Sequence, residues 1–373
     1  MARLCGSTIA SARPREVHIS SRSRSSRTAF AFSALEPSRC TGGVGVGFSC
    51  PMTHASNLTT VSDPSRKPGL RLVVLLNAGA GTASHRGSDG LRGDLAAALQ
   101  ALDVSADLEV CSGPDLKHFA EGALARAQAA EIDAVVVGGG DGSIRTVAGV
   151  LAGTNVPLGI LPLGTLNHFV KDLGIPLHVK EAAEVIARGE TRAVDLAEVN
   201  GETFINNSSI GIYPYIVLDR ERRRAHHKLT KWMAMVPALF RLLKHFPRRQ
   251  LALSAEGWTR PYRTPCLLIG NNEYGMEFFE LGRRHHLDRG ELSVYVVKQR
   301  RPFGFFWMIC RMVFGKVSQA RDIESFRLKE VQVRSKTSRL PVALDGEVEM
   351  MRPPLQYRSL PGALRVIVTT QGR

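Results

Sequence analysis

The stretch Val135-Val-Val-Gly-Gly-Gly-Asp-Gly-Ser143 is the most informative part of the sequence. A short apolar run of this kind is typical of a strand buried in a parallel sheet. The four glycines that follow within five positions leave no side chains before the next helical pattern, so backbone N–H groups and a helix N-terminus can bind a phosphate. The pattern predicts a phosphate-binding loop formed by Gly138, Gly139, Gly140, Gly142 and Ser143.

Asp141 is the one acidic residue among these glycines. Its carboxylate would repel a phosphate that it touched directly. It can instead bind Mg²⁺, or accept a hydrogen bond from a group that positions the nucleotide. The alternative is a glycine-rich turn that only connects a strand to a helix. We expect a ligand-binding role, because such a loop belongs at the carboxyl edge of an open parallel sheet.

Strand and helix patterns alternate around this loop from Leu70 to about residue 192. This alternation predicts a parallel α/β sheet with right-handed crossovers. The expected strands are 72–76, 106–110, 134–137 and 157–161, and the expected helices between them include 91–102, 116–127 and 143–151.

Beyond Val194 the pattern changes to strand-like runs without regular helices between them. It predicts a second, mostly antiparallel domain over 193–373, a sandwich or a barrel, whose last strand can return to the first domain. Two helical insertions are expected, at 229–245 and 303–314. The strand-like runs are 193–199, 202–206, 266–270, 292–297, 331–333 and 364–369.

Two further loops follow strands of the first domain. One contains Asn77 and Gly81, and the other contains Gly164, Thr165 and Asn167. Each loop alone is compatible with an ordinary turn. Because the carboxyl ends of parallel strands meet at one edge of the sheet, the three loops together predict a nucleotide site there.

Three segments resemble the signatures of a known family: GGGDGS at 138–143, LPLGTLNHF at 161–169 and LDGE at 344–347. They resemble the diacylglycerol kinase catalytic fold, a group with bacterial lipid kinases, sphingosine kinases and ceramide kinases. The resemblance runs from about Leu70 to the C-terminus. It implies an NAD kinase-like or diacylglycerol kinase-like α/β domain, an antiparallel β-sandwich, and ATP between the two. The phosphates would lie on the Gly139–Ser143 loop near Thr165, and Glu347 would be the base.

A physical argument also points to Glu347. Phosphoryl transfer to an alcohol needs a carboxylate to accept the proton and a metal, Mg²⁺, to neutralise charge. Asp345-Gly-Glu347 follows the strand-like Val342-Ala-Leu344, so we expect a tight turn that exposes both acids. The alternative is a hairpin turn, for which Asp-Gly is a common choice.

The sequence departs from the family at several positions. Arg145-Thr146 stands where the family usually has Asn-Glu, and Arg145 is expected either to pair with phosphate or to lie on the surface. The resemblance implies a structural Mg²⁺ near 287–291, with an aspartate directly before the glycine. That position is Arg289 here, and Asp288 is kept as a candidate metal ligand.

Composition and charge limit the functions further. The chain has 373 residues, of which 44% are hydrophobic and 22% charged, as in a globular protein. A net charge of +15 favours polyanionic partners such as nucleic acid, an anionic bilayer or phosphorylated small molecules. The six cysteines contain no C-x-x-C pair, which is typical of reduced, intracellular proteins without zinc sites or disulfides. No apolar run is long enough to span a bilayer, so a cytoplasmic protein with peripheral membrane contact is expected.

The first 69 residues form a basic leader rich in Ser and Arg, which we expect to be disordered. Such a leader resembles a transit peptide. The preferred alternative is that translation begins at Met52.

Membrane contact is expected from two segments. Residues 228–246 interleave basic and apolar side chains, with Arg222–Arg224 just before them, and residues 303–309 form an aromatic cluster. A basic amphipathic helix with Trp and Phe suits an anionic membrane interface. The alternative for each segment is a helix that packs its apolar face on the second domain.

The sequence therefore predicts an ATP-dependent lipid kinase that uses Mg²⁺ and phosphorylates a membrane lipid. The alternatives are a kinase for a small molecule, such as NAD kinase or phosphofructokinase, and a catalytically silent membrane-binding or nucleic-acid-binding homologue. The D-G-E and LPLGTLNHF segments favour the lipid kinase, and no nucleic-acid partner is expected. The acceptor lipid and the oligomeric state stay open.

Overall fold

The computed structural model describes residues 69–80, 88–224, 246, 248–274, 284, 286–299, 301–313 and 322–369. The basic leader before Gly69, Gly81 and the expected helix at 229–245 lie outside these residues.

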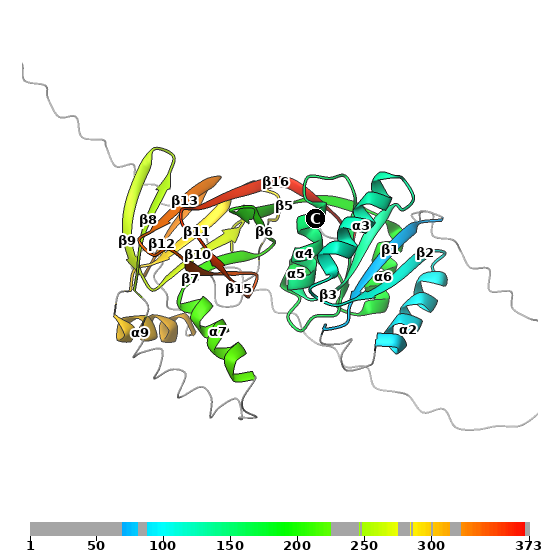
Figure 1. The fold of residues 1–373 in the computed structure, drawn as a ribbon, viewed down its shortest axis with the longest axis horizontal. Coiled ribbons are helices and arrows are strands. Elements are labelled where there is room, and N and C mark those ends of the chain that lie inside the picture. The colour runs from blue at the N-terminus through cyan, green and yellow to red at the C-terminus, as the bar shows by residue number, and fades with distance from the viewer. Residues whose placement is uncertain are drawn as a thin grey trace, which may run out of the picture. The chain divides into compact units, whose positions relative to one another are not determined.

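A parallel sheet with helices on its two faces forms the first half of the described chain (Figure 1). Its strand order is β2-β1-β3-β4, and the β1–β2, β1–β3 and β3–β4 pairs are parallel, as predicted. The strands are β1 (Arg71–Asn77), β2 (Ser105–Cys111), β3 (Ala134–Gly139) and β4 (Leu158–Pro162). The helices are α2 (Ser88–Gln100), α3 (Leu116–Gln128), α4 (Asp141–Leu151), α5 (His168–Asp172) and α6 (Val179–Arg188).

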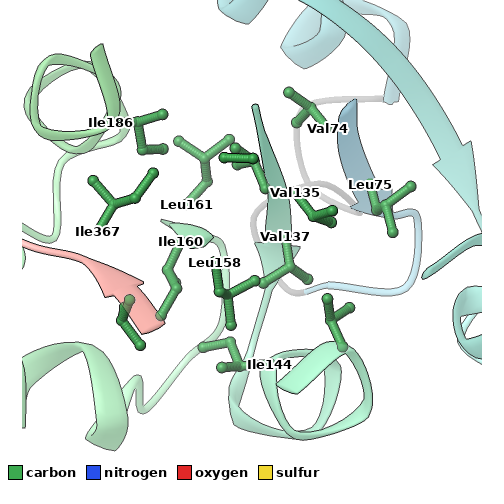
Figure 2. Close-up of a cluster of buried hydrophobic side chains, with 14 of the residues drawn as sticks. Val74, Leu75, Val135, Val137, Ile144, Leu158, Ile160, Leu161, Ile186 and Ile367 are labelled. Carbon is green, nitrogen blue, oxygen red and sulfur yellow. The ribbon is translucent and has the colours of Figure 1, made fainter. Parts of the chain in front are cut away.

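The central strands are apolar because both faces of the sheet are covered. Every residue of β3 and of β4 is buried. Figure 2 shows Ile144 of α4 and Ile186 of α6 packing against these strands from opposite sides. Because β1, β3 and β4 are parallel, the loops that follow them emerge together at one edge of the sheet.

The second half of the described chain is an antiparallel β-sandwich. One of its sheets has the strand order β12-β11-β10-β7-β14-β15. These strands are β7 (Asn207–Gly211), β10 (Cys266–Asn271), β11 (Leu292–Val297), β12 (Ile323–Leu328), β14 (Leu340–Leu344) and β15 (Glu347–Met351). Two helices, α7 (Ile212–Arg224) and α9 (Pro302–Val313), follow β7 and β11 along the chain.

The other layer of the sandwich continues the parallel sheet rather than forming a separate one. The path runs on from β4 through β16 to β13, β8 and β9, with β5 and β6 paired beside β16. The added strands are β5 (Thr191–Val199), β6 (Glu202–Phe204), β8 (Arg249–Ala255), β9 (Trp258–Thr264), β13 (Glu330–Ser335) and β16 (Leu355–Ile367).

The last strand is longer than the sequence pattern predicts. The pattern indicates a strand at 364–369, whereas β16 covers Leu355–Ile367. Pro361 and Gly362 interrupt the apolar pattern, and the pairing of β16 with β5 shifts register between Leu360 and Leu364. Val366 of β16 pairs in parallel with Leu158 of β4, while Tyr357 pairs with Val199 of β5.

In the part of the chain that the structure describes, no helix is both long enough and apolar enough to cross a membrane.

Candidate functional site

The loop after β1 is bonded to the start of α4. The side-chain amide of Asn77 donates from Nδ2 to the hydroxyl oxygen of Ser143 at 2.8 Å. Its Oδ1 accepts the backbone N–H of Gly79 at 2.9 Å. Asn77 therefore joins two of the three predicted loops, and Ser143 is buried between them.

Asp141 connects the glycine loop to the loop after β4. Its Oδ2 accepts the backbone N–H of His168 at 3.2 Å, and its Oδ1 accepts that of Phe169 at 3.1 Å. These two amides belong to the first turn of α5, whose own N-cap residue, Asn167, makes no side-chain capping bond. Asp141 thus caps α5 from another loop. Of the two predicted roles, this geometry favours positioning the loops over binding a metal.

The glycine and β4 loops touch at their glycines. A Cβ on Gly140 would lie 3.3 Å from Cα of Gly164, and a Cβ on Gly138 would lie 2.5 Å from the Leu76 side chain. The glycines therefore allow backbone and side chains to approach closely. Gly140 is also the N-cap of α4 and gives it no side-chain cap. The uncapped N-terminus of this 11-residue helix is suited to an anion.

Thr165 and Asn167 lie on the β4 loop in different environments. Thr165 is exposed. Asn167 is buried with a left-handed backbone, φ +50°, and donates from Nδ2 to the carbonyl of Gly164 at 2.9 Å. Among the described residues its Oδ1 has no hydrogen-bond partner, so Asn167 keeps a free acceptor beside the loop.

The turn between β14 and β15 does not expose both of its acids, and that prediction is wrong for Asp345. Its carboxylate turns inward and accepts three backbone N–H groups, from Ile205 at 2.8 Å, Asn206 at 2.7 Å and Asn207 at 3.1 Å. Burial raises the pKa of Asp345 to about 6, although the three amides and Arg145 act to lower it. These three hydrogen bonds fix the turn at Asp345. They also hold its backbone in the left-handed region, at φ +48°, which is uncommon for a residue other than glycine.

Glu347, in contrast, is exposed over 64% of its side chain and lies at the glycine loop. A Cβ on Gly142 would be only 2.5 Å from Oε1 of Glu347. The predicted base and the predicted phosphate loop are therefore in contact, although they are far apart in the sequence.

Arg145 is neither a surface residue nor a free phosphate ligand. Only 12% of its side chain is exposed. Its Nη1 lies 3.5 Å from Oε2 of Glu347 and donates to the carbonyl of Leu344 at 3.3 Å. Its Nη2 forms an ion pair with Glu349. No pattern in the sequence indicates Glu349 as its partner.

Asp288 is occupied by an ion pair. Its Oδ2 lies 2.7 Å from Nη2 of Arg192. Arg289 pairs with Glu273 at 3.3 Å and lies 3.9 Å from Glu291. Nowhere in the described ranges do three or more His, Cys, Asp or Glu side chains gather as a metal site.

The sequence also gave no indication of a buried ion pair between α5 and the sandwich. Asp172, the last residue of α5, accepts from Nε of Arg284 at 2.8 Å, and both side chains are almost completely buried. The same guanidinium donates to the carbonyl of Ile205 at 2.6 Å and to Oδ1 of Asn206 at 2.8 Å. It thus links α5 to the segment whose amides bind Asp345.

The aromatic cluster predicted to contact a membrane is divided between two faces of α9. Phe305 and Met308 are buried in a small cluster beside the sandwich. Phe303 and Trp307 are 76% and 56% exposed. The packing alternative therefore applies to one face of the helix, and membrane contact by the exposed face stays a prediction.

Comparison with known proteins gives matches over most of the described chain. Residues 71–199 match the family described as diacylglycerol kinase catalytic domain, and residues 219–368 match the YegS C-terminal NAD kinase beta sandwich-like domain. A diacylglycerol kinase from Mycobacterium tuberculosis (strain CDC 1551 / Oshkosh) is 34% identical over 273 residues, with 68% of this chain and 83% of that protein covered. A Pseudomonas fluorescens protein (strain Pf-5) named "probable lipid kinase YegS-like" is 27% identical, covering 75% of this chain and 92% of that protein.

A solved structure has a similar fold. The crystal structure of a diacylglycerol kinase from Bacillus anthracis str. Sterne gives a TM-score of 0.57 at 22% identity. The match covers 81% of this chain and 98% of that one.

Proposed function

The chain belongs to the diacylglycerol kinase family of lipid kinases, and we propose that it transfers the γ-phosphoryl group of ATP to a hydroxyl group of a membrane lipid. The observation that carries this proposal is the contact between the Glu347 carboxylate and Gly142 of the glycine loop. It supports a site in which a base stands beside the place where a phosphate would bind. In this proposal the region 70–192 binds the nucleotide and the region 193–373 presents the base.

The loops support nucleotide binding in a specific way. The uncapped N-terminus of α4 is suited to an anion, and Gly140 and Gly164 place no side chains over the backbone there. Hydrogen bonds of Asn77, Ser143 and Asp141 hold these loops together. The exposed Thr165 remains available for the nucleotide.

Magnesium fits this site as a companion of the nucleotide. Mg²⁺ in kinases is held by phosphate oxygens and water, with one or two carboxylates. Asp141 uses one lone pair on each oxygen for α5 and retains others, so it can supply one ligand at most alongside its positioning role. Bound Mg²⁺ would neutralise charge on the β- and γ-phosphates.

The proposed reaction assigns each residue a definite step. The Glu347 carboxylate accepts the proton of the lipid hydroxyl as its oxygen attacks the γ-phosphorus. The bond to the ADP oxygen breaks, and the N–H groups of the glycine loop stabilise the charge on the transferring group. Asp345 keeps the turn, and therefore Glu347, in place.

We also propose that the protein works at the surface of an anionic membrane. The net charge of +15 and the exposed Phe303 and Trp307 on α9 support this. The basic helical segment expected at 229–245 lies outside the described residues.

The test is phosphoryl transfer from radiolabelled ATP, with Mg²⁺, to vesicles containing diacylglycerol, a sphingoid base, ceramide or phosphatidylglycerol, with NAD as a soluble acceptor. We expect labelled lipid. Glu347→Gln should lower kcat by roughly 100-fold or more while KM for ATP is preserved, because a general base acts on the acceptor.

The exposed Glu184 on α6 gives a matched control, since Glu184→Gln should leave kcat unchanged. Label in NAD but in no lipid would favour a small-molecule kinase. Absence of transfer to every acceptor would favour a silent homologue.

A further inference from the structure

We propose that Arg145 is a positioning residue that holds the Glu347 carboxylate against the nucleotide loop. This inference rests on the proposed function, in which Glu347 is the base. It assigns a role to a side chain that differs from the Asn that the family usually has at this position.

The guanidinium of Arg145 is itself fixed. It extends from α4, the helix that follows the glycine loop, and contacts both strands of the β14–β15 hairpin. It donates to the carbonyl of Leu344 on β14 and pairs with Glu349 on β15. With only 12% of its side chain exposed, Arg145 is a fixed cation rather than a mobile surface charge.

Glu347 needs such a partner because its side chain is mostly exposed. A glutamate with 64% of its side chain in solvent samples many rotamers unless something restrains it. Glu347 and Glu349 are two positions apart on β15, so they point to the same face and repel each other. Arg145 contacts both carboxylates and offsets this repulsion.

The contacts also distinguish the two oxygens of Glu347. Oε2 lies 3.5 Å from Nη1 of Arg145. Oε1 is the oxygen nearer to Gly142, where a Cβ would lie 2.5 Å from Oε1 and 3.9 Å from Oε2. Arg145 therefore holds one oxygen and leaves the other facing the loop, where it can accept the proton of the lipid hydroxyl.

A double-mutant cycle with Glu347 tests this. Arg145→Ala should lower kcat by roughly 10-fold or more, because small displacements of a reacting group reduce the rate strongly, and KM for ATP should be unchanged. In a Glu347→Gln background the same substitution should change kcat by less than about twofold, since the residue that it positions is already lost. Arg145→Lys should restore part of the activity.

Arg126 provides the matched control. It also extends from a helix, α3, and pairs with two acids, Asp107 and Glu131. Arg126→Ala should leave kcat and KM unchanged. If Arg145→Ala does not fold, Glu349→Gln, which removes one contact of the guanidinium, should lower kcat in the same Glu347-dependent way.

Two results would overturn the positioning role. One is an increase in KM for ATP in Arg145→Ala, together with losses of kcat that multiply when Arg145→Ala and Glu347→Gln are combined. This result would make Arg145 a nucleotide ligand. The other is an unchanged kcat in Arg145→Ala, or in Glu349→Gln where the alanine variant does not fold. Full activity of Glu347→Gln would instead contradict the proposed base itself, so the two failures are distinguishable.

Discussion

At the scale of single residues, the glycines of the nucleotide loop have different neighbours. Gly138 faces the Leu76 side chain, Gly140 faces the backbone of Gly164, and Gly142 faces the carboxylate of Glu347. The space that a side chain would need is therefore taken partly by the protein itself. A side chain added at Gly142 would affect catalysis most directly, because the atom that it would meet belongs to the proposed base.

Gly142→Ala should displace the Glu347 carboxylate. The new methyl group would lie 2.5 Å from Oε1, which is closer than atoms can approach, and the flexible side chain of Glu347 would move rather than the backbone. We expect kcat to fall by roughly 10-fold or more with little change in melting temperature. Steady-state kinetics with lipid vesicles and thermal unfolding measure the two quantities.

Gly122 in α3 is the control, because no atom lies within 4 Å of a Cβ built there. Gly122→Ala should keep full activity and stabilise the protein by about 0.5–1 kcal/mol, since alanine favours helix. Unchanged kcat in Gly142→Ala would mean that Glu347 need not contact the loop.

Asp345 and Glu347 are two positions apart and have opposite environments. Asp345 is bound by three backbone amides, whereas Glu347 is exposed. Burial raises the pKa of Asp345 to about 6, above the value near 4 expected for an unfolded chain. The folded protein therefore binds a proton at this site more readily than the unfolded chain does between about pH 4 and pH 6.

This difference predicts a pH dependence of stability with a definite sign. As pH rises from about 4 to about 6, the contribution of Asp345 to the free energy of unfolding should decrease, and above about pH 6 it should level off. Asp345→Asn removes this titration. The measurement is the difference in unfolding free energy between the parent and the variant, by urea denaturation across that pH range. If the unfolding free energy of the parent minus that of Asp345→Asn increases with pH, the amides and Arg145 lower the pKa of Asp345 more than burial raises it.

At the scale of elements, α9 combines a packing face with an exposed aromatic face. Phe305 and Met308 belong to a buried cluster, whereas Phe303 and Trp307 are exposed. Large exposed aromatic side chains suit the boundary between lipid and water. The helix can therefore pack on the sandwich and still contribute to membrane contact.

The double substitution Phe303→Ala and Trp307→Ala should weaken sedimentation with anionic vesicles and lower kcat/KM on vesicle lipids. Activity on a soluble short-chain acceptor should be spared, because these side chains have no part in the transfer step. Leu177 is an exposed apolar side chain before α6, and Leu177→Ala is the control that should change neither. Undiminished sedimentation of the double variant would assign membrane contact to another surface.

Elements with strong local signals could be predicted from the sequence, and those defined by distant partners could not. The apolar run of β3 and the glycines after it predicted a strand, a loop and a helix. The edge strand β9, Trp258–Thr264, is mostly polar and contains Pro261, so it gives no strand signal. Likewise, the loop residues were predictable because they follow strand ends. The amides that bind Asp345 lie 138–140 residues away, and Glu349 lies 204 residues from Arg145.

At the scale of the whole described chain, β5 and β16 pass through two hydrophobic cores. Val194 and Leu364 belong to the core of the parallel sheet, and Val199 and Leu355 belong to the core of the sandwich. Strands shared in this way make it difficult for one half to unfold alone. The buried Asp172–Arg284 pair adds a second link, since it joins α5 to the carbonyl of Ile205 and to Asn206.

Asp172→Ala should therefore destabilise the described chain as one unit. The substitution leaves the fully buried guanidinium of Arg284 without its carboxylate, which costs about 3–5 kcal/mol. We expect a large decrease in melting temperature with a single calorimetric transition, because the shared strands couple both cores. Asp107→Ala, which breaks a surface pair with Arg126, should change stability by no more than about 1 kcal/mol. Two separate transitions in Asp172→Ala would contradict the coupling, and they would mean that this ion pair, rather than β5 and β16, makes the two cores unfold together.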